Sequence, residues 1–405
     1  MILVRRIKNT DLIEWLVVFG IYCNFYVEFC CMLCAIALSI KNNDYRTAVG
    51  KKQVLLLSYI FLYSSVSIFF YSYAYSKFIQ QFVLLSAFIF GYNILFNRLK
   101  YHLDSLLGKY LTITFCVASL GLVQFVIYYF TGHNILQFVY HSDADEVFPR
   151  IIRITSILDE AGYLSILLTP AVIYAIITKQ VFVKRYLAIE LCFILTFGAV
   201  SYLVIILAIM FLIFRSFAKT KLIITAGAVL LVTFIAYQTA SEYNSSHKTK
   251  TGVIKRFEDT FQGFMELEPN NFEVLNMSSY AFLTNIWVAI HAPNRISGTG
   301  LGTHEQNYTS TYKSSHVYYG TNSTDGYSFF NRAFSEFGIV GCVLVLMFLF
   351  KNYNRYNVLN IMCLSILFSF LLKGGHYVRY GFIFWCYLYY YSGRSKYAEH
   401  PEKIS

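Results

Sequence analysis

Long apolar stretches constrain this chain more than any other feature. About 20 apolar residues are needed to cross roughly 30 Å of hydrocarbon. Stretches near that length are residues 54–75, 78–96, 106–130, 157–178, 221–239, 331–350, 356–372 and 377–393. Only 14% of the 405 residues are charged, against roughly 25% in an average soluble domain. The sequence therefore predicts an integral membrane protein.

Two further stretches, 12–40 and 186–214, are too long for one upright span. A single helix of that length would reach about 43 Å at 1.5 Å per residue. If each stretch instead crosses twice, most clusters of Lys and Arg fall on the cytoplasmic side, as the positive-inside rule favours. These clusters lie in 41–52, 98–109, 179–185 and 215–221. We predict an all-α polytopic fold of about twelve transmembrane helices with both termini in the cytoplasm.

This topology gives the chain an asymmetric organisation. It predicts an N-terminal transmembrane bundle in 1–239 of about nine spans, a large extracytoplasmic loop in 240–330 and three spans in 331–393. A cytoplasmic tail, 394–405, follows. Within the large loop, apolar residues recur at helical spacing over 278–291. This pattern predicts an amphipathic helix lying along the membrane surface.

Several function classes are disfavoured. The net charge of +11 follows the positive-inside rule and does not require a nucleic-acid partner. No CxxC pair lies in a polar loop, and HExxH, GxSxG and Walker motifs are absent from the sequence. Asp143 and Asp145 could hold a divalent ion, but an ordinary acidic loop is the favoured interpretation. We expect neither a metal nor a cofactor.

Four charges stand at the start of one predicted span. Arg150 and Arg153 precede it, and Asp159 and Glu160 lie near its head. Carboxylates within a membrane are costly and are functional candidates by default. The alternative is an interfacial anchor with an Arg153–Glu160 pair that neutralises itself, if the helix begins early enough for the two to share a face.

The large loop adds basic residues and glycines. Arg256 and Arg295 precede the run GTGLG, in which Gly298, Gly300 and Gly302 resemble a phosphate-cradling loop, although glycine-rich turns are common. His304 follows this run.

Further charges lie near the last three spans. Arg332 and Glu336 are four apart, and the alternative for them is an exposed ion pair of small value. The segment LLKGGHYVRYG (371–381) brings Lys373, His376 and Arg379 to the outer face. Arginines and lysines with isolated carboxylates and histidines suit a diphosphate delivered from the membrane, with one acid or base beside it.

Three segments resemble bacterial O-antigen polymerases, whose superfamily also includes O-antigen ligases. The segments are RxxSIxxE (153–160), LTFGAVSYLVII (195–206), and SxxxFLTNIWVAIHAPNRISGTGLG followed by NRAFSEFGIVG. Tyr327 stands where ligases have a histidine, which favours a polymerase.

This resemblance implies a GT-C-like fold and a metal-independent inverting glycosyltransferase. The enzyme would join undecaprenyl-diphosphate-linked oligosaccharide repeat units at the periplasmic face of the bacterial inner membrane, during lipopolysaccharide O-antigen biosynthesis. It would work among inner-membrane lipids, with a flippase and a chain-length regulator as possible partners.

The resemblance and the charges together suggest roles for individual residues. Arg153, with Arg150 or Arg256, would hold the diphosphate. Glu160 would be the general base or position the acceptor. His304, Arg295 and Arg332 are second candidates.

Three other functions remain open at this point. An O-antigen ligase would transfer finished glycan to lipid A core. A flippase or transporter for lipid-linked oligosaccharide would be expected to place charges along a central cavity, whereas here they concentrate outside. A purely structural membrane scaffold would need no site at all.

Overall fold

The computed structural model describes residues 9–41, 50–135, 146–148, 150–216, 262–265, 267–269, 272 and 277–394. The predicted span 221–239 lies outside these residues, as do Arg256 and the acidic pair Asp143 and Asp145.

The part of the chain that the structure describes is mainly helical, which confirms the all-α class. The helices are α1 (Asn9–Gly20), α2 (Phe25–Lys41), α3 (Lys51–Phe70), α4 (Tyr75–Leu99), α5 (Leu103–Thr131), α6 (Ala161–Ile177), α7 (Lys184–Leu195), α8 (Ala199–Ser216), α11 (Met277–His291), α12 (His304–Thr311), α13 (Phe329–Lys351), α14 (Val358–Leu372) and α15 (Phe382–Arg394). One small antiparallel ribbon pairs β1 (Glu146–Phe148) with β2 (Ile151–Ile152).

Four of the described helices, α3, α4, α5 and α13, are long and apolar enough to cross a membrane. Shorter apolar helices are α6, α14 and Val200–Ile209 within α8. The outer faces of α3 and α13 expose large apolar side chains, among them Leu55 at 72%, Phe70 at 76% and Phe350 at 78%. Such faces suit lipid as their neighbour. The chain is a membrane protein, while the full number of spans stays a prediction.

Both overlong apolar stretches are broken in the middle. Residues 12–40 form α1 and α2 around a turn at 21–24, and 186–214 form α7 and α8 around a break at 196–198. In the first turn Ile21 and Tyr22 are buried, and the hydroxyl of Tyr22 lies 2.6 Å from that of Thr114 on α5. The second lies against α6, where a Cβ on Gly198 would come within 2.3 Å of Ser165 Oγ. Each stretch is therefore divided into two shorter helices, while the prediction that each crosses the membrane twice stays a prediction.

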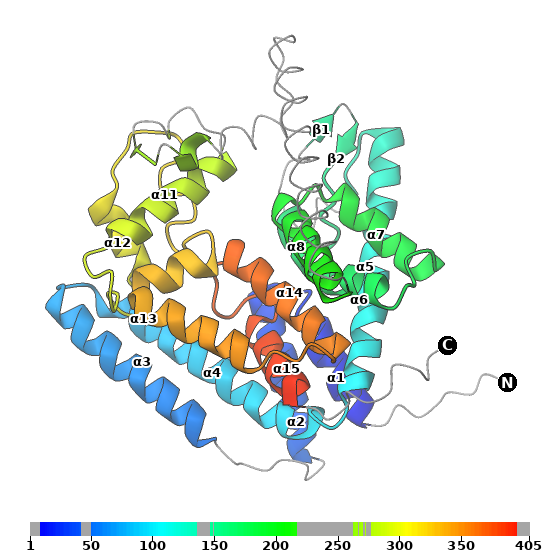
Figure 1. The fold of residues 1–405 in the computed structure, drawn as a ribbon, viewed down its shortest axis with the longest axis horizontal. Helices are drawn as coiled ribbons and strands as arrows, with labels where there is room; N and C mark the ends of the chain where they lie inside the picture. The colour runs from blue at the N-terminus through cyan, green and yellow to red at the C-terminus, as the bar shows by residue number, and fades with distance from the viewer. Residues whose placement is uncertain are drawn as a thin grey trace.

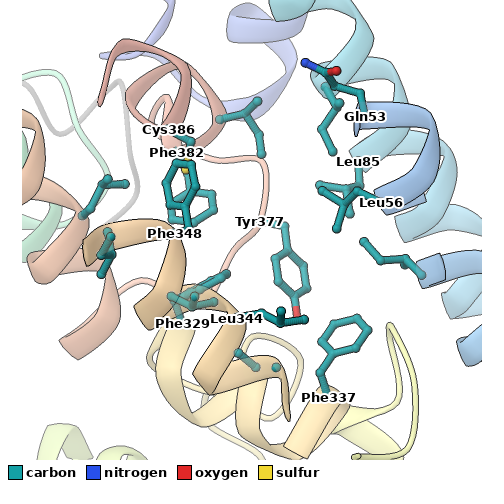
Figure 2. A pocket seen from close by; sticks show the side chains of 18 of the residues that line it. Gln53, Leu56, Leu85, Phe329, Phe337, Leu344, Phe348, Tyr377, Phe382 and Cys386 are labelled. Atoms are coloured by element: carbon teal, nitrogen blue, oxygen red, sulfur yellow. The ribbon is translucent and has the colours of Figure 1, made fainter. Parts of the chain in front are cut away.

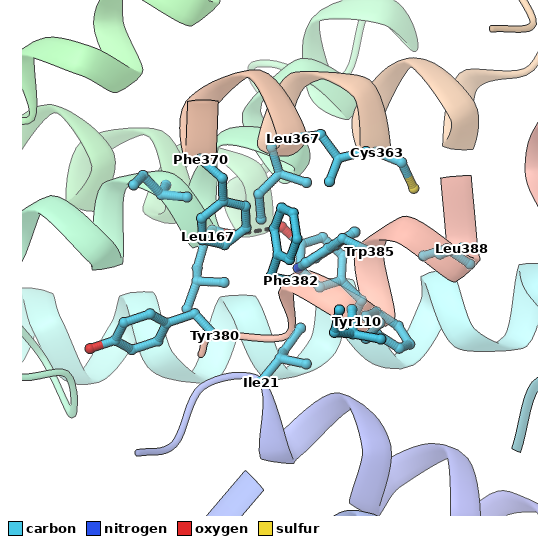
Figure 3. Packing of buried hydrophobic residues seen from close by; sticks show 14 of the residues in the cluster. Ile21, Tyr110, Leu167, Cys363, Leu367, Phe370, Tyr380, Phe382, Trp385 and Leu388 are labelled. Atoms are coloured by element: carbon cyan, nitrogen blue, oxygen red, sulfur yellow. Dashed lines mark hydrogen bonds between the residues drawn. The ribbon is translucent and has the colours of Figure 1, made fainter. Parts of the chain in front are cut away.

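The helices form two groups that meet at α14 and α15. In Figure 1, α3 and α4 lie side by side beyond α13, and α11 and α12 lie near the start of α13. On the other side are α5 to α8, with α6 packed along α14. Figure 3 shows the core where these groups meet. The ring of Trp385 from α15 stands edge-on to Tyr110 of α5, whose hydroxyl donates to the carbonyl of Leu167 on α6 at 2.6 Å.

Helix α13 is broken at Gly338, whose backbone (φ 61°, ψ −159°) is not helical. Residues 295–302 cross the helix at this point and supply the lost hydrogen bonds. The amides of Ile339 and Val340 donate to the carbonyls of residues 295 and 296, at 2.9 and 3.0 Å, and the amide of Gly300 donates to the carbonyl of Glu336 at 2.8 Å. The break therefore leaves these backbone groups satisfied, as an apolar environment requires.

Glycine is required on both sides of this crossing. A Cβ on Gly298 would lie 2.3 Å from the carbonyl of Glu336, and one on Gly338 would lie 2.4 Å from the carbonyl of Ile296. Both residues have positive φ, 79° and 61°. The two backbones are in direct contact, which is why segment 295–302 packs onto α13 at a defined register.

We expect Gly298→Ala to destabilise the protein far more than Gly320→Ala. Gly320 has nearly the same φ, 82°, but nothing lies within 4 Å of its added Cβ, so that variant meets only the backbone strain of about 1–2 kcal/mol. Gly298→Ala adds a backbone collision, and the loss should exceed about 3 kcal/mol. Thermal unfolding of both purified variants in detergent measures the difference, and equal shifts would refute the close crossing.

Candidate functional site

A group of charged and polar side chains gathers at one end of the helices, where three segments distant in sequence meet. We call it the polar cluster. It contains Arg153 and Glu160 before α6, Asp325 and Tyr327 before α13, and Lys373 and His376 after α14.

Residues 153–160 are not helical: they contain a turn in which the amide of Leu158 donates to the carbonyl of Thr155 at 3.0 Å, and α6 begins only at Ala161. The amide of Ile154 donates to the carbonyl of Leu195 at 3.1 Å, and Arg153 Nε donates to the carbonyl of Thr196 at 3.1 Å. Ser156 Oγ donates to the carbonyl of Val117 at 2.7 Å. The idea that Arg153 and Glu160 share a helix face is therefore wrong, because the helix does not begin early.

Glu160 forms an ion pair with Lys373, the residue that follows α14. The carboxylate side chain is 44% exposed and that of Lys373 only 14%. Burial acts to lower the pKa of Lys373, but the nearby Glu160 outweighs it and the pKa is raised, so the ammonium stays charged. Gly162 makes room for it, since a Cβ there would lie 2.3 Å from Lys373 Nζ.

Asp325 and His376 form a second pair. His376 Nε2 lies 3.0 Å from Asp325 Oδ2. The other carboxylate oxygen, Oδ1, accepts from the backbone amide of Tyr327 at 3.1 Å. The side-chain amide of Asn322 donates to Oδ2 at 3.3 Å. Burial acts to raise the pKa of Asp325, but the hydrogen bonds, with His376 first, outweigh it and lower the pKa to about 2. Asp325 is therefore a carboxylate at neutral pH.

The segment 373–381 that carries Lys373 and His376 is fixed along its length. The amide of Gly374 donates to the carbonyl of Tyr327 at 2.9 Å, and the amide of Gly381 donates to Glu28 at 3.2 Å. A Cβ on Gly375 would lie 1.5 Å from the carbonyl of Asp325. Tyr380 donates its hydroxyl to Asp159. The segment is a clamped connection, so its side chains are held in place before any substrate binds.

Arg332 and Glu336 are buried, at 3% and 0% exposure, so the alternative of an exposed ion pair is wrong. Arg332 Nε donates to Glu336 Oε1 at 3.0 Å, and its Nη1 donates to the carbonyl of Gly375 at 3.0 Å. Tyr377 donates its hydroxyl to Glu336 Oε2 at 2.6 Å, and its ring lies 4.3 Å from the guanidinium carbon of Arg332. Arg332 therefore holds the last helices together and does not reach a diphosphate.

The glycines of GTGLG do not form a phosphate cradle. The amides of Gly298 and Gly300 are taken by the carbonyls of Asn294 and Glu336, at 2.9 and 2.8 Å. Gly302 packs on the start of α4, where a Cβ would lie 3.1 Å from the backbone of Lys77 and Phe78. The physical need for these glycines is the close crossing at α13 and α4.

His304 is also removed from the catalytic candidates by its position. It is fully buried at the start of α12, and its Nε2 donates to Asn285 Oδ1 at 2.8 Å. Burial lowers the pKa of His304 to about 3, so the ring is neutral. It has no open side toward a substrate. Arg150 and Arg295, by contrast, are exposed, with Arg295 at the outer side of the α13 crossing.

The amphipathic helix predicted over 278–291 is present as α11, but its apolar stripe is part of the protein interior. Tyr280 and Leu283 are fully buried and pack in an aromatic cluster with Tyr308 and Tyr312. Only the end of the stripe, at Ile290, is exposed, at 37%. The sequence pattern identified the helix and its buried face, but protein covers much of that face where a membrane surface was expected.

An apolar cavity of about 550 Å³ lies between α3 and α4 on one side and α13 and α15 on the other. Figure 2 shows the ring of Tyr377 directed into it, with Phe329 and Phe337 at the same end. Lys52 and Gln53 line it as well, at the start of α3. Tyr377 is next to His376, so the segment 373–381 borders both the cavity and the polar cluster.

The sequence alone predicts Arg153 and Glu160 as site residues. It also predicts that Lys373 and His376 lie at the outer face, without a role for either, and it does not indicate Asp325. A signal was present: Lys373 and His376 flank two glycines directly after an apolar span, a pattern that predicts close backbone packing beside charged groups. Nothing in the local sequence connects that segment with Asp325.

Within the described residues, no three His, Cys, Asp or Glu side chains are grouped so that they could hold a metal ion. No family model, no curated protein and no solved structure matches this chain.

Removing one partner of the buried Arg332–Glu336 pair should be strongly destabilising. Arg332→Met or Glu336→Gln leaves a buried group unpaired, and we expect a loss of about 3–5 kcal/mol for either. The double variant should lose less than the sum, because neither charge is then left alone. Thermal unfolding in detergent gives the three values.

The exposed pair Lys77–Glu305 is the matched control. Its atoms are 2.9 Å apart, but the side chains are 47% and 35% exposed, so Lys77→Met should change stability by less than about 1 kcal/mol. Similar losses for Lys77→Met and Arg332→Met would contradict the structural role of Arg332.

Proposed function

We propose that this protein is an O-antigen polymerase, a membrane glycosyltransferase that joins undecaprenyl-diphosphate-linked oligosaccharide repeat units. The main support is that segment 373–381 borders both the polar cluster and the apolar cavity. One fixed segment, 373–381, contributes a cation and a histidine to a polar cluster and a tyrosine to an apolar cavity. A substrate with a charged diphosphate and a long apolar tail needs both environments side by side.

Cations surround the position proposed for the diphosphate. Lys373 and Arg153 both lie near Tyr327, where each acts to lower the pKa of its hydroxyl against the effect of burial, and Arg379 follows on the same segment as Lys373. Glu160 neutralises Lys373 in the free protein, and its exposure leaves it open to displacement by a diphosphate. The cations would then meet the charge that grows on the leaving diphosphate, while Glu160 positions the acceptor sugar.

The cavity suits the polyprenyl chain. Its wall is mostly Leu, Ile and Phe, and it extends from Tyr377 beside the polar cluster to Lys52 and Gln53 at the start of α3. Burying an isoprenoid chain in such a wall is favoured by about 25 cal/mol for each Å² of apolar surface removed from water.

The distribution of basic residues supports an orientation with the polar cluster in the periplasm. Helices α6 and α14 have 17 and 15 residues, and each has one end at the cluster, so at 1.5 Å per residue their other ends are about 25 Å away. Those distant ends carry Lys179, Lys184, Lys351 and Arg355. This is the side that the positive-inside rule assigns to the cytoplasm.

Deleting the gene should shorten the lipopolysaccharide ladder on a gel to core plus one repeat unit. The wild-type gene should restore the ladder, whereas Arg153→Ala, Glu160→Ala and Lys373→Met should not, with polymer reduced by roughly 100-fold or more. Lys313→Ala, which removes an exposed lysine outside the cluster, is the control and should restore it fully. Membrane expression of each variant is measured alongside.

Other ladder patterns would identify other functions. Bare core with lipid-linked polymer in the periplasm would mean a ligase. Single repeats left on the inner leaflet would mean a flippase. A full ladder from all three cluster variants would exclude the site.

Filling the cavity should weaken binding of the lipid-linked substrate. Leu344 lines the cavity, whereas its neighbour Val343 does not, and the two are 47% and 46% exposed. Leu344→Trp should raise KM for the lipid-linked repeat unit by about 10-fold or more, equivalent to about 1.4 kcal/mol. Val343→Trp should leave KM unchanged. An equal effect of both would show that the cavity does not hold the chain.

A further inference from the structure

His376 presents an imidazole with one nitrogen engaged and the other available. Nε2 is occupied by Asp325 Oδ2 at 3.0 Å, and the side chain is 25% exposed. Within the described residues, the ring makes no further hydrogen bond. A group that takes a proton from a sugar hydroxyl needs such an arrangement: one nitrogen fixed by a partner, and one directed to solvent or substrate.

The partner determines which nitrogen is the base. Asp325 is ionised, so it can only accept a hydrogen bond, and Nε2 must carry the proton. The lone pair is then on Nδ1. Burial outweighs Asp325 and lowers the pKa of His376, so the ring is neutral at physiological pH and ready to accept a proton. The charged groups that act on it are Asp325, Arg379 on its own segment and Arg332 on α13.

His376 is also rigidly placed next to the cations. The backbone on both sides of it is fixed, by Gly374 to Tyr327 and by Arg332 to Gly375, and Tyr377 donates to Glu336. Three residues earlier on the same segment is Lys373, whose Nζ lies 5.9 Å from the centre of the Tyr327 ring. Tyr327 also donates its backbone amide to Asp325, the partner of His376, so a diphosphate held by Lys373 would present its sugar on the side of the Asp325–His376 pair.

The geometry points to Asp325 and His376 as a dyad in which His376 is the general base for the acceptor hydroxyl, an assignment that rests on the proposed function. His376 Nδ1 takes the hydroxyl proton as the acceptor oxygen attacks the anomeric carbon of the donor sugar. The bond between that carbon and the diphosphate oxygen breaks, and the electron pair leaves with the polyprenyl diphosphate. The imidazolium that forms is stabilised by Asp325 and later gives its proton to water.

The other candidate bases are less suited to this step. Glu160 pairs with Lys373 in the free protein and, once displaced, positions the acceptor sugar, and His304 is fully buried. His316 stacks on Tyr280 at 4.9 Å and its Nδ1 accepts from the amide of Tyr318 at 3.3 Å.

The test is polymerisation by the purified full-length protein. Its substrate is the undecaprenyl-diphosphate-linked repeat unit extracted from cells that lack the gene. His376→Ala and His376→Gln should lower kcat by roughly 10²- to 10⁴-fold, the range of general base catalysis. Added imidazole should restore part of the rate of His376→Ala. Because protonation of Nδ1 removes the base, the wild-type rate should fall as the pH drops through the pKa of His376. In the rescued variant the rate should instead fall as the pH drops through the pKa of free imidazole.

Three variants separate chemistry from folding. His376→Gln keeps a donor for Asp325 and so preserves the contact, but it cannot accept a proton. Asp325→Asn should lower kcat with little change in KM, because the amide no longer fixes the tautomer. His133→Gln, an exposed histidine after α5, should behave as wild type.

The outcomes distinguish this dyad from the proposed function itself. If the wild-type protein makes no polymer, the polymerase function fails, and the dyad with it. If wild type polymerises and folded His376→Gln keeps the wild-type rate, the dyad is refuted and the function stands. If imidazole gives no rescue of His376→Ala and the pH profile of the residual rate is that of wild type, His376 is only structural.

Discussion

The buried ion pair between Arg332 and Glu336 fixes the segments on which the polar cluster depends. Two charges removed from water are unfavourable unless every donor and acceptor is used. Here the guanidinium contacts Glu336, the carbonyl of Gly375 and Gln81 of α4, and Glu336 also accepts from Tyr377. One pair on α13 therefore determines where α4 and segment 373–381 lie. Lys373 and His376 take their places from that segment.

The same region contains the break at Gly338, and the two features depend on each other. The carbonyl of Glu336 cannot serve a regular helix past Gly338, and it accepts from the amide of Gly300 instead. The crossing segment 295–302 thus supports the backbone of the residue whose side chain binds Arg332. Interruption of a membrane helix is tolerated where protein replaces the lost hydrogen bonds. Glycines with positive φ let the two backbones come close enough to form these hydrogen bonds.

The helices were largely predictable from the sequence, whereas the site was predictable only in part. Apolar length and helical spacing identified α3, α4, α5, α13 and α14, and charge distribution split the two overlong stretches. The roles of Gly298, Gly300 and Arg332 were misassigned. Exposure of a glycine loop or an i, i+4 ion pair depends on what packs over it, and that is tertiary information. The burial of His304 against Asn285 of α11 could not be predicted for the same reason.

For the polar cluster, the sequence indicates individual charged residues but not which residues they contact. Glu160 and Arg153 attract attention because charges at the start of an apolar span are costly. Lys373, which pairs with Glu160, and the pair of Asp325 and His376 come from distant segments, and no periodicity relates them. Within segment 373–381, the two glycines signal close packing, but not against which residue.

The pairing of Glu160 with Lys373 has a consequence for how the protein is made. The two residues are 213 positions apart, so a ribosome delivers the first to the membrane long before the second is synthesised. Until α14 is inserted, Glu160 has no cation, and Asp325 has no imidazole. The cluster is complete only when the last helices have joined the bundle. A nascent or truncated chain therefore lacks the assembled cluster, and assembly of the membrane domain is itself the step that creates it.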